Sequence, residues 1–79
     1  MTILLRAGGL LKDYLKPDVD EFTRRVDAVE GTPLRDILRG IGLPPGHVAM
    51  AFAGERLVNL AYVPSEGDVI TLRPPVQGG

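Results

Sequence analysis

The last six residues of the chain hold the groups whose types and spacing suggest chemistry. They read Pro74-Pro75-Val76-Gln77-Gly78-Gly79. The two prolines cannot donate to a sheet ladder and favour an extended conformation. A carboxylate is a poor acyl donor, so an external enzyme would have to adenylate it, and glycine leaves a narrow approach channel unobstructed. We therefore predict a protruding tail over residues 74–79, whose carboxylate at Gly79 is reactive and whose chemistry is catalysed by another protein.

The glycine pair alone is a weak signal. At average glycine usage two terminal glycines arise by chance in about one chain in 200, and an unstructured terminus is the simplest alternative. The prediction depends on context, because the pair follows a predicted strand and two prolines that hold it away from the body.

The rest of the chain offers little catalytic chemistry. There is no cysteine, and the single histidine, His47, has no acidic neighbour in sequence. We interpret it as a surface or strand-edge residue. The acidic residues around position 20 lack a calcium-loop pattern, so we expect no metal site. Gly8-Gly9 lacks the spaced glycines and the lysine of a phosphate loop and is interpreted as a turn.

Length and charge exclude several further classes. A chain of 79 residues fits one domain. Its net charge of −1 comes from interleaved signs, so we expect no nucleic-acid partner. No apolar run approaches the ~20 residues of a membrane span, and no secretory leader pattern is visible. We therefore expect no membrane association, and a cytoplasmic location.

The first half of the sequence predicts two strands. Residues 2–7 alternate as a mostly buried strand that Gly8-Gly9 ends. Residues 10–15 could form one helical turn, but Pro17 disfavours helix at the preceding residue, so we predict a short turn or loop. Residues 21–29 form the second strand, with Phe22, Val26 and Ala28 on one face and Arg24 near an edge.

A helix is the clearest local signal. Thr32 is placed to cap it and Pro33 to occupy its first position. Its apolar stripe comprises Leu34, Ile37, Leu38 and Ile41. Gly42 fits a left-handed terminator, and the prolines that follow prevent continuation.

The remaining elements are strands. Residues 47–53 alternate between a bulky face, with Val48, Met50 and Phe52, and a face of three alanines at 49, 51 and 53. The alanines could be a flat docking face or small residues beneath a covering loop. Gly54-Glu55 predicts a turn, residues 56–58 a short strand, residues 64–68 another turn and residues 69–73 the last strand. The order predicts an α+β domain over residues 1–73, with a sheet packed on one main helix.

These residues resemble a known family. The ending that carries the resemblance is Gly67-Asp68-Val69-Ile70-Thr71-Leu72-Arg73-Pro74-Pro75-Val76-Gln77-Gly78-Gly79. It resembles the ending of the MoaD/ThiS ubiquitin-like sulfur carriers, in which Gly-Asp and a strand precede Gly-Gly. Residues 30–34, 42–45 and 53–55 extend the resemblance over nearly the whole chain. It implies a β-grasp fold, a mixed four- to five-stranded sheet packed on one main helix.

The implied activity is carriage of sulfur. After adenylation by an activating enzyme of the MoeB/ThiF type, which uses ATP, Gly79 would become a thiocarboxylate and donate sulfur in cofactor biosynthesis. The protein itself would bind no cofactor and would not be catalytic alone. The implied partner-binding residues are Arg73, Pro74, Pro75, Val76, Gln77 and Gly78.

Pro74-Pro75 favours the MoaD branch, the small subunit of molybdopterin synthase, whose tail enters a MoaE-like large subunit. Arg73 stands where many MoaD-like members carry an aromatic residue, and Ala53 replaces the usual asparagine. Arg73 is equally well interpreted as a solvent-facing residue or as a contact to an acidic partner groove.

Two other functions stay open from the sequence. A ubiquitin-like modifier would be conjugated through Gly79, and a noncovalent β-grasp interaction module would not need Gly78 and Gly79. A thiamin-type carrier is an alternative within the first class. The sequence does not distinguish molybdopterin, tungstopterin, thiazole, tRNA or cysteine as the destination of the sulfur.

Overall fold

The computed structural model describes residues 1–75 and has the predicted α+β order. Its elements are β1 (Thr2–Arg6), α1 (Leu11–Leu15), β2 (Thr23–Asp27), α2 (Leu34–Gly40), the 3-10 turn η1 (Pro45–His47), β3 (Met50–Ala53), β4 (Arg56–Val58) and β5 (Val69–Arg73). Within the described residues no helix combines the length and the apolar character needed to cross a membrane.

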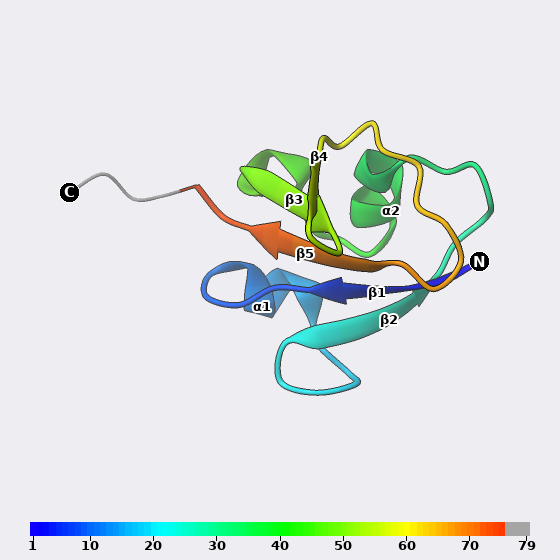
Figure 1. Ribbon diagram of the computed structural model, residues 1–79. Coiled ribbons are helices and arrows are strands. Elements are labelled where there is room, and N and C mark those ends of the chain that lie inside the picture. Colours follow the sequence, from blue (N-terminus) through cyan, green and yellow to red (C-terminus); the bar gives the residue numbers. More distant parts are fainter. Residues whose placement is uncertain (76–79) are drawn as a thin grey trace.

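One mixed five-stranded sheet organises the molecule, in the order β2-β1-β5-β3-β4. β1 and β5 pair in parallel, and the other neighbours are antiparallel. Because β1 and β5 run side by side in one direction, the end of β5 lies at the opposite end of the molecule from the N-terminus (Figure 1). The mixed sheet of the predicted β-grasp fold is confirmed.

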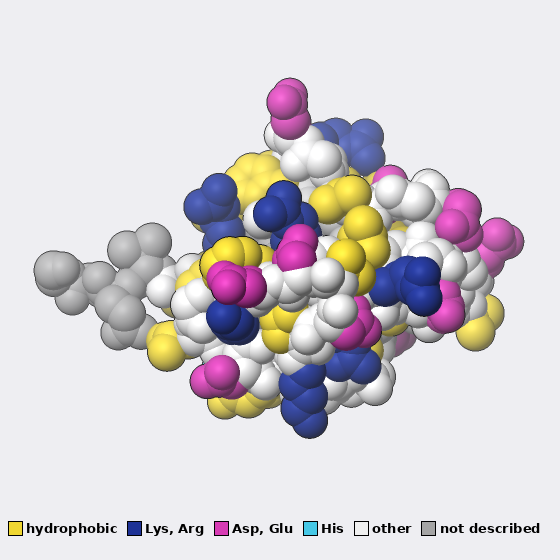
Figure 2. Space-filling view, turned by 90° about the horizontal axis from the view of Figure 1, so that it is seen from below, with side chains coloured by type: hydrophobic (Ala, Val, Ile, Leu, Met, Phe, Trp, Pro, Cys, Tyr) yellow, Lys and Arg dark blue, Asp and Glu magenta, His cyan; other side chains and the backbone are white. Residues whose placement is uncertain are grey.

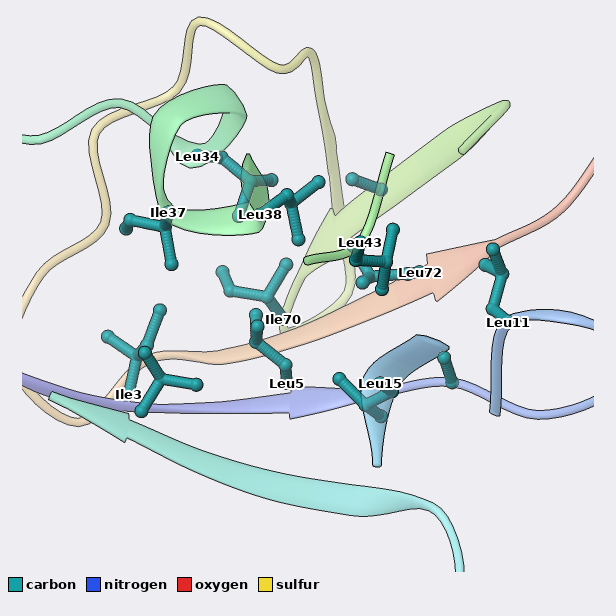
Figure 3. Close-up of a cluster of buried hydrophobic side chains, with 13 residues drawn as sticks. Ile3, Leu5, Leu11, Leu15, Leu34, Ile37, Leu38, Leu43, Ile70 and Leu72 are labelled. Carbon is teal, nitrogen blue, oxygen red and sulfur yellow. The ribbon is translucent and has the colours of Figure 1, made fainter. Parts of the chain in front are cut away.

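The core lies between α2 and one face of the sheet. Leu34, Ile37 and Leu38 point from α2 toward the strands (Figure 3), as their helical spacing predicts. Alternate residues of β1 and β5 meet them, and the fully buried ones are Ile3, Leu5, Ile70 and Leu72. The alternation along both strands therefore places one face of each against the core.

The start of α2 differs from the sequence prediction. Thr32 was expected to cap the helix, but the capping position is Pro33 and no side chain caps the helix. Instead, the amides of Leu34 and Arg35 donate to the carbonyls of Tyr62 and Leu60, at 2.8 and 2.9 Å. Carbonyls of a loop distant in sequence thus accept hydrogen bonds from these two amides, which have no partner within the helix. No local sequence motif reveals such a contact.

The end of α2 follows the prediction. Gly42 adopts φ +82°, a conformation that costs glycine least. Its amide donates to the Arg39 carbonyl, and the Leu43 amide donates to the Leu38 carbonyl at 2.9 Å. These two bonds form a Schellman motif, and the fully buried Leu43 adds the accompanying apolar contact.

Residues 11–15 form a short helix, so the prediction of a turn or loop was wrong. Lys16 adopts the left-handed conformation at φ 54°, which ends α1 before Pro17 can clash with it. Leu11 and Leu15 are buried in the core. Arg24 donates to the Leu15 carbonyl at 3.1 Å and satisfies the end of the helix. Tertiary burial and this contact stabilise a helix too short to form by itself.

The structure decides between the two interpretations of the alanines. Ala51 pairs with the inward-facing Leu72 and is buried, so the three alanines are not a free docking face, and Met50 is 42% exposed. Phe22 was expected to share a strand face with Val26, but it precedes β2 and is 43% exposed, whereas Val26 is buried. Arg24 does lie at an edge, because β2 is an outer strand of the sheet.

A hydrogen-bonded turn fixes the start of β5. The Asp68 carboxylate accepts bonds from the Ser65 amide at 2.9 Å and from the Tyr62 hydroxyl at 2.6 Å. Gly67, at φ +82°, donates its amide to the Thr2 carbonyl at 2.8 Å. The Ser65 amide, followed by the Tyr62 hydroxyl, lowers the pKa of Asp68, and the bond to Asp68 raises the pKa of Tyr62. The Gly-Asp pair therefore sets where the last strand begins.

We expect Leu38→Ala to lower the free energy of unfolding by about 2–5 kcal/mol, because truncation of this fully buried side chain leaves a cavity in the core. Leu10→Ala, at a side chain 68% exposed, should change it by less than about 0.5 kcal/mol. Urea denaturation followed by circular dichroism measures both. Equal effects would contradict the assigned core.

The Asp68 turn predicts a pH dependence. A carboxyl group whose pKa is lowered in the folded state contributes stability above its unfolded pKa, near ~3.9, and that stability is lost as the pH falls through the folded pKa. Asp68→Asn should therefore lower stability at pH 7 and show a smaller further loss under acid than the wild type. Denaturation series from neutral to acidic pH measure this. Glu30→Gln, which removes an exposed carboxylate elsewhere, is the control, and a curve for Asp68→Asn parallel to that of the wild type would overturn the assignment.

Candidate functional site

The candidate site begins where the central strand ends. β5 lies between β1 and β3, and Leu72 pairs with Ala51 while Arg73 pairs with Met50. The last bond of this ladder runs from the Ala49 amide to the Arg73 carbonyl, at 2.8 Å. Pro74 follows at once and has no amide hydrogen to continue the pairing. The chain therefore leaves the sheet from its interior strand, at a position fixed by the pairing with β3.

The root of the tail, residues 73–75, is the part of the predicted site that the structure describes. Arg73 is exposed, and its guanidinium carbon lies 5.6 Å from the centroid of the Phe52 ring. This distance suits a cation–π contact. Pro74 is half-buried and Pro75 is exposed. The other predicted site residues, Val76, Gln77, Gly78 and Gly79, lie outside the described residues.

An apolar recess of about 200 Å³ borders one side of the root. It is lined by Leu10, Leu11, Gly46, His47, Pro74 and Pro75. His47 is exposed and packs against Tyr14, with ring centroids 5.1 Å apart. The histidine thus belongs to the surface beside the tail, a placement that its position in the sequence did not reveal.

A larger groove of about 510 Å³ borders the root on the side of β1. Its lining comprises Arg6, Ala7, Gly8, Gly9, Phe22, Thr71, Leu72, Arg73 and Pro74. Arg6 was not singled out from the sequence, because it lies 67 positions before Arg73 and only the parallel pairing of β1 with β5 brings the two together. The one available signal was a charged residue near the end of the first predicted strand.

The Asp20 carboxylate positions Phe22 in this groove. The Asp20 carboxylate accepts a hydrogen bond from the Phe22 amide at 2.8 Å, and this bond is the main cause that lowers the pKa of Asp20. The charge of Arg6 lowers that pKa more weakly. The aromatic ring is thereby turned out of β2 and over Gly8, where an added Cβ would lie 3.6 Å from the ring. Lys12 places its ammonium 5.1 Å from the centroid of the same ring.

The described residues hold no group of three or more histidine, cysteine or acidic side chains arranged to bind a metal ion. The sequence contains no cysteine. What the arrangement offers is a surface of recesses and cations around the root of a strand, and such a surface suits recognition by another protein.

A comparison with known proteins identifies the fold of the chain. No protein-family model matches the chain, and no curated protein does so either. Among solved structures, the crystal structure of SAMP1 from Haloferax volcanii is similar over 100% of both chains, with a TM-score of 0.71 and 20% sequence identity. The chain therefore has a β-grasp fold like that of SAMP1 over its full length.

Proposed function

We propose that this protein is a sulfur carrier whose Gly79 carboxylate is activated and sulfurated by partner enzymes. The observation that carries the proposal is the end of β5, where an interior strand held on both sides delivers the chain into Pro74 and Pro75. A rigid exit is useful to a carrier, because it directs a terminal group into another protein's active site. The β-grasp fold and the family-like residues 67–79 support the same function.

The chemistry divides between this chain and its partner. The Gly79 carboxylate attacks the α-phosphorus of ATP, pyrophosphate leaves, and an acyl adenylate forms in the activating enzyme. Hydrosulfide then adds to the acyl carbon, the bond to AMP breaks, and a proton is released as the thiocarboxylate forms. This chain contributes the carboxylate and the shape of its approach, and ATP is bound by a partner of the MoeB/ThiF type.

Within this class we favour the molybdopterin branch. The tail would then act in the active site of a large subunit of the MoaE type, with this chain as the small subunit of the synthase. Pro74 and Pro75 support that choice, because a stiff spacer presents the end of the tail at a set distance from the sheet. Arg73 departs from the aromatic residue of many such carriers, and in the structure it lies over Phe52.

Incubation with a MoeB/ThiF-type enzyme from the same genome, ATP and sulfide should raise the intact mass by the difference between one sulfur and one oxygen atom. Mass spectrometry of the intact chain and of its C-terminal peptide measures the change. A chain truncated after Gln77 is the control and should stay unchanged. An unchanged wild-type mass with an enzyme that sulfurates its own carrier would contradict the proposal, and a tail-derived remnant on lysines of other proteins would favour the modifier instead.

Gly78→Val should slow adenylation on the order of 10²-fold, because a branched side chain next to the reacting residue displaces the carboxylate in a narrow channel. ATP–pyrophosphate exchange at saturating carrier measures this rate. Gln77→Ala, which shortens a side chain one position earlier, is the matched control and should retain the rate within about twofold. Equal rates for Gly78→Val and the wild type would show that the penultimate residue does not enter a confined site.

A further inference from the structure

The groove beside the root of the tail carries two arginines on one face of the sheet. Arg6 pairs in register with Thr71, and Arg73 lies two residues beyond Thr71 on the same strand. Side chains two residues apart share a face, so both arginines project to the side opposite the core. With strands ~4.8 Å apart and a rise of ~3.3 Å per residue, their Cα atoms lie roughly 8 Å apart.

Among the described residues, neither arginine has a close counter-ion. Within residues 1–75 the one ion pair closer than 4 Å joins Arg39 to Asp36, away from the groove. Asp20 lies near enough to feel the charge of Arg6, but it is engaged by the Phe22 amide. Glu55 lines a neighbouring hollow with Arg73 without pairing closely with it. Two adjacent like charges favour an anionic ligand, which would relieve their repulsion.

The walls of the groove are partly apolar. Phe22 contributes hydrophobic surface beside the two arginines, and Lys12 adds a third positive charge over the Phe22 ring. On the face seen in Figure 2, basic and acidic side chains are intermixed with hydrophobic ones, so no broad basic surface appears there. A local cationic groove with apolar walls fits an acidic peptide segment with hydrophobic neighbours better than a phosphate backbone, which requires an extended basic field.

The position of the groove restricts which proteins can bind in it. Six residues follow Arg73 in the sequence, and they span at most roughly 20 Å when extended. An enzyme that holds the Gly79 carboxylate in its active site must therefore bring its surface to the end of β5. We propose that the groove formed around Arg6, Arg73 and Phe22 binds an acidic segment of the activating enzyme. This inference rests on the proposed function and adds a determinant of partner choice to it.

The first experiment uses the activating enzyme and the variant Arg6→Glu/Arg73→Glu. Its KM in ATP–pyrophosphate exchange should rise by about tenfold or more with kcat largely retained, because rim charges act mainly on association. Raising the salt concentration should weaken activation of the wild type more than that of the variant. Arg35→Glu/Arg39→Glu, which makes the same change of charge on the exposed side of α2, is the control, and its KM should stay within about twofold of the wild-type value. Arg6→Lys/Arg73→Lys should retain most of the activity.

Equal KM values for the two doubly reversed variants would overturn the inference while leaving sulfur carriage intact. The substituted arginines are all exposed, and circular dichroism and denaturation establish that each variant folds. A wild-type chain that no activating enzyme adenylates would count against the proposed function instead.

A second experiment does not depend on activation. An acetylated peptide of alternating glutamate and leucine is titrated into the isotope-labelled chain, and amide shifts are followed by NMR. Shift changes should be confined to residues 6–9, Phe22 and residues 71–73. The Arg6→Glu/Arg73→Glu variant should show no such changes with this peptide. It should respond instead to a peptide of alternating lysine and leucine. Shifts caused equally by inorganic phosphate or AMP, or shifts spread over the whole surface, would overturn recognition of an acidic peptide at this groove.

Discussion

Parallel pairing of β1 with β5 is the constraint on which the rest of the molecule depends. Leu5 lies in register with Ile70, so the first and last strands form the centre of the sheet. Bringing the first and last strands together costs chain entropy, because nearly the whole chain lies between them. The burial of both strands against α2 offsets this cost. Once the pairing exists, β2 and β3 extend the sheet outward, and the chain leaves the sheet from its central strand.

This arrangement separates stability from chemistry. The core is built from aliphatic residues between the sheet and α2, while the groups proposed to react lie beyond Arg73. The Arg73 carbonyl accepts the last hydrogen bond of the ladder. Pro74 cannot extend the ladder, because proline has no amide hydrogen. A protein of this design can change its tail or the surface around the root without disturbing its core, so partner recognition can vary on one unchanged fold.

The surface around the root shows how charge can replace an apolar contact. Arg73 is held over Phe52 and so keeps an aromatic partner while presenting a cation. Phe22, turned outward by the Asp20 hydrogen bond, and Arg6 complete the opposite wall. Electrostatic complementarity of this kind selects among partners and speeds encounter more than it adds affinity. This would suit the proposed carrier, which would have to be released after each transfer.

The sequence by itself determined the elements whose signals are local: the stripe of Leu34, Ile37 and Leu38, the terminator Gly42 and the order of the strands. The family-like ending predicted the β-grasp fold, and the tail over residues 76–79 stays a prediction from sequence. Tertiary structure decided the features that depend on distant partners. It made α1 a helix through the burial of its leucines, satisfied the start of α2 with loop carbonyls instead of Thr32, and buried Ala51. It also brought Arg6 to Arg73, because strand pairing is a contact between segments that no local spacing encodes.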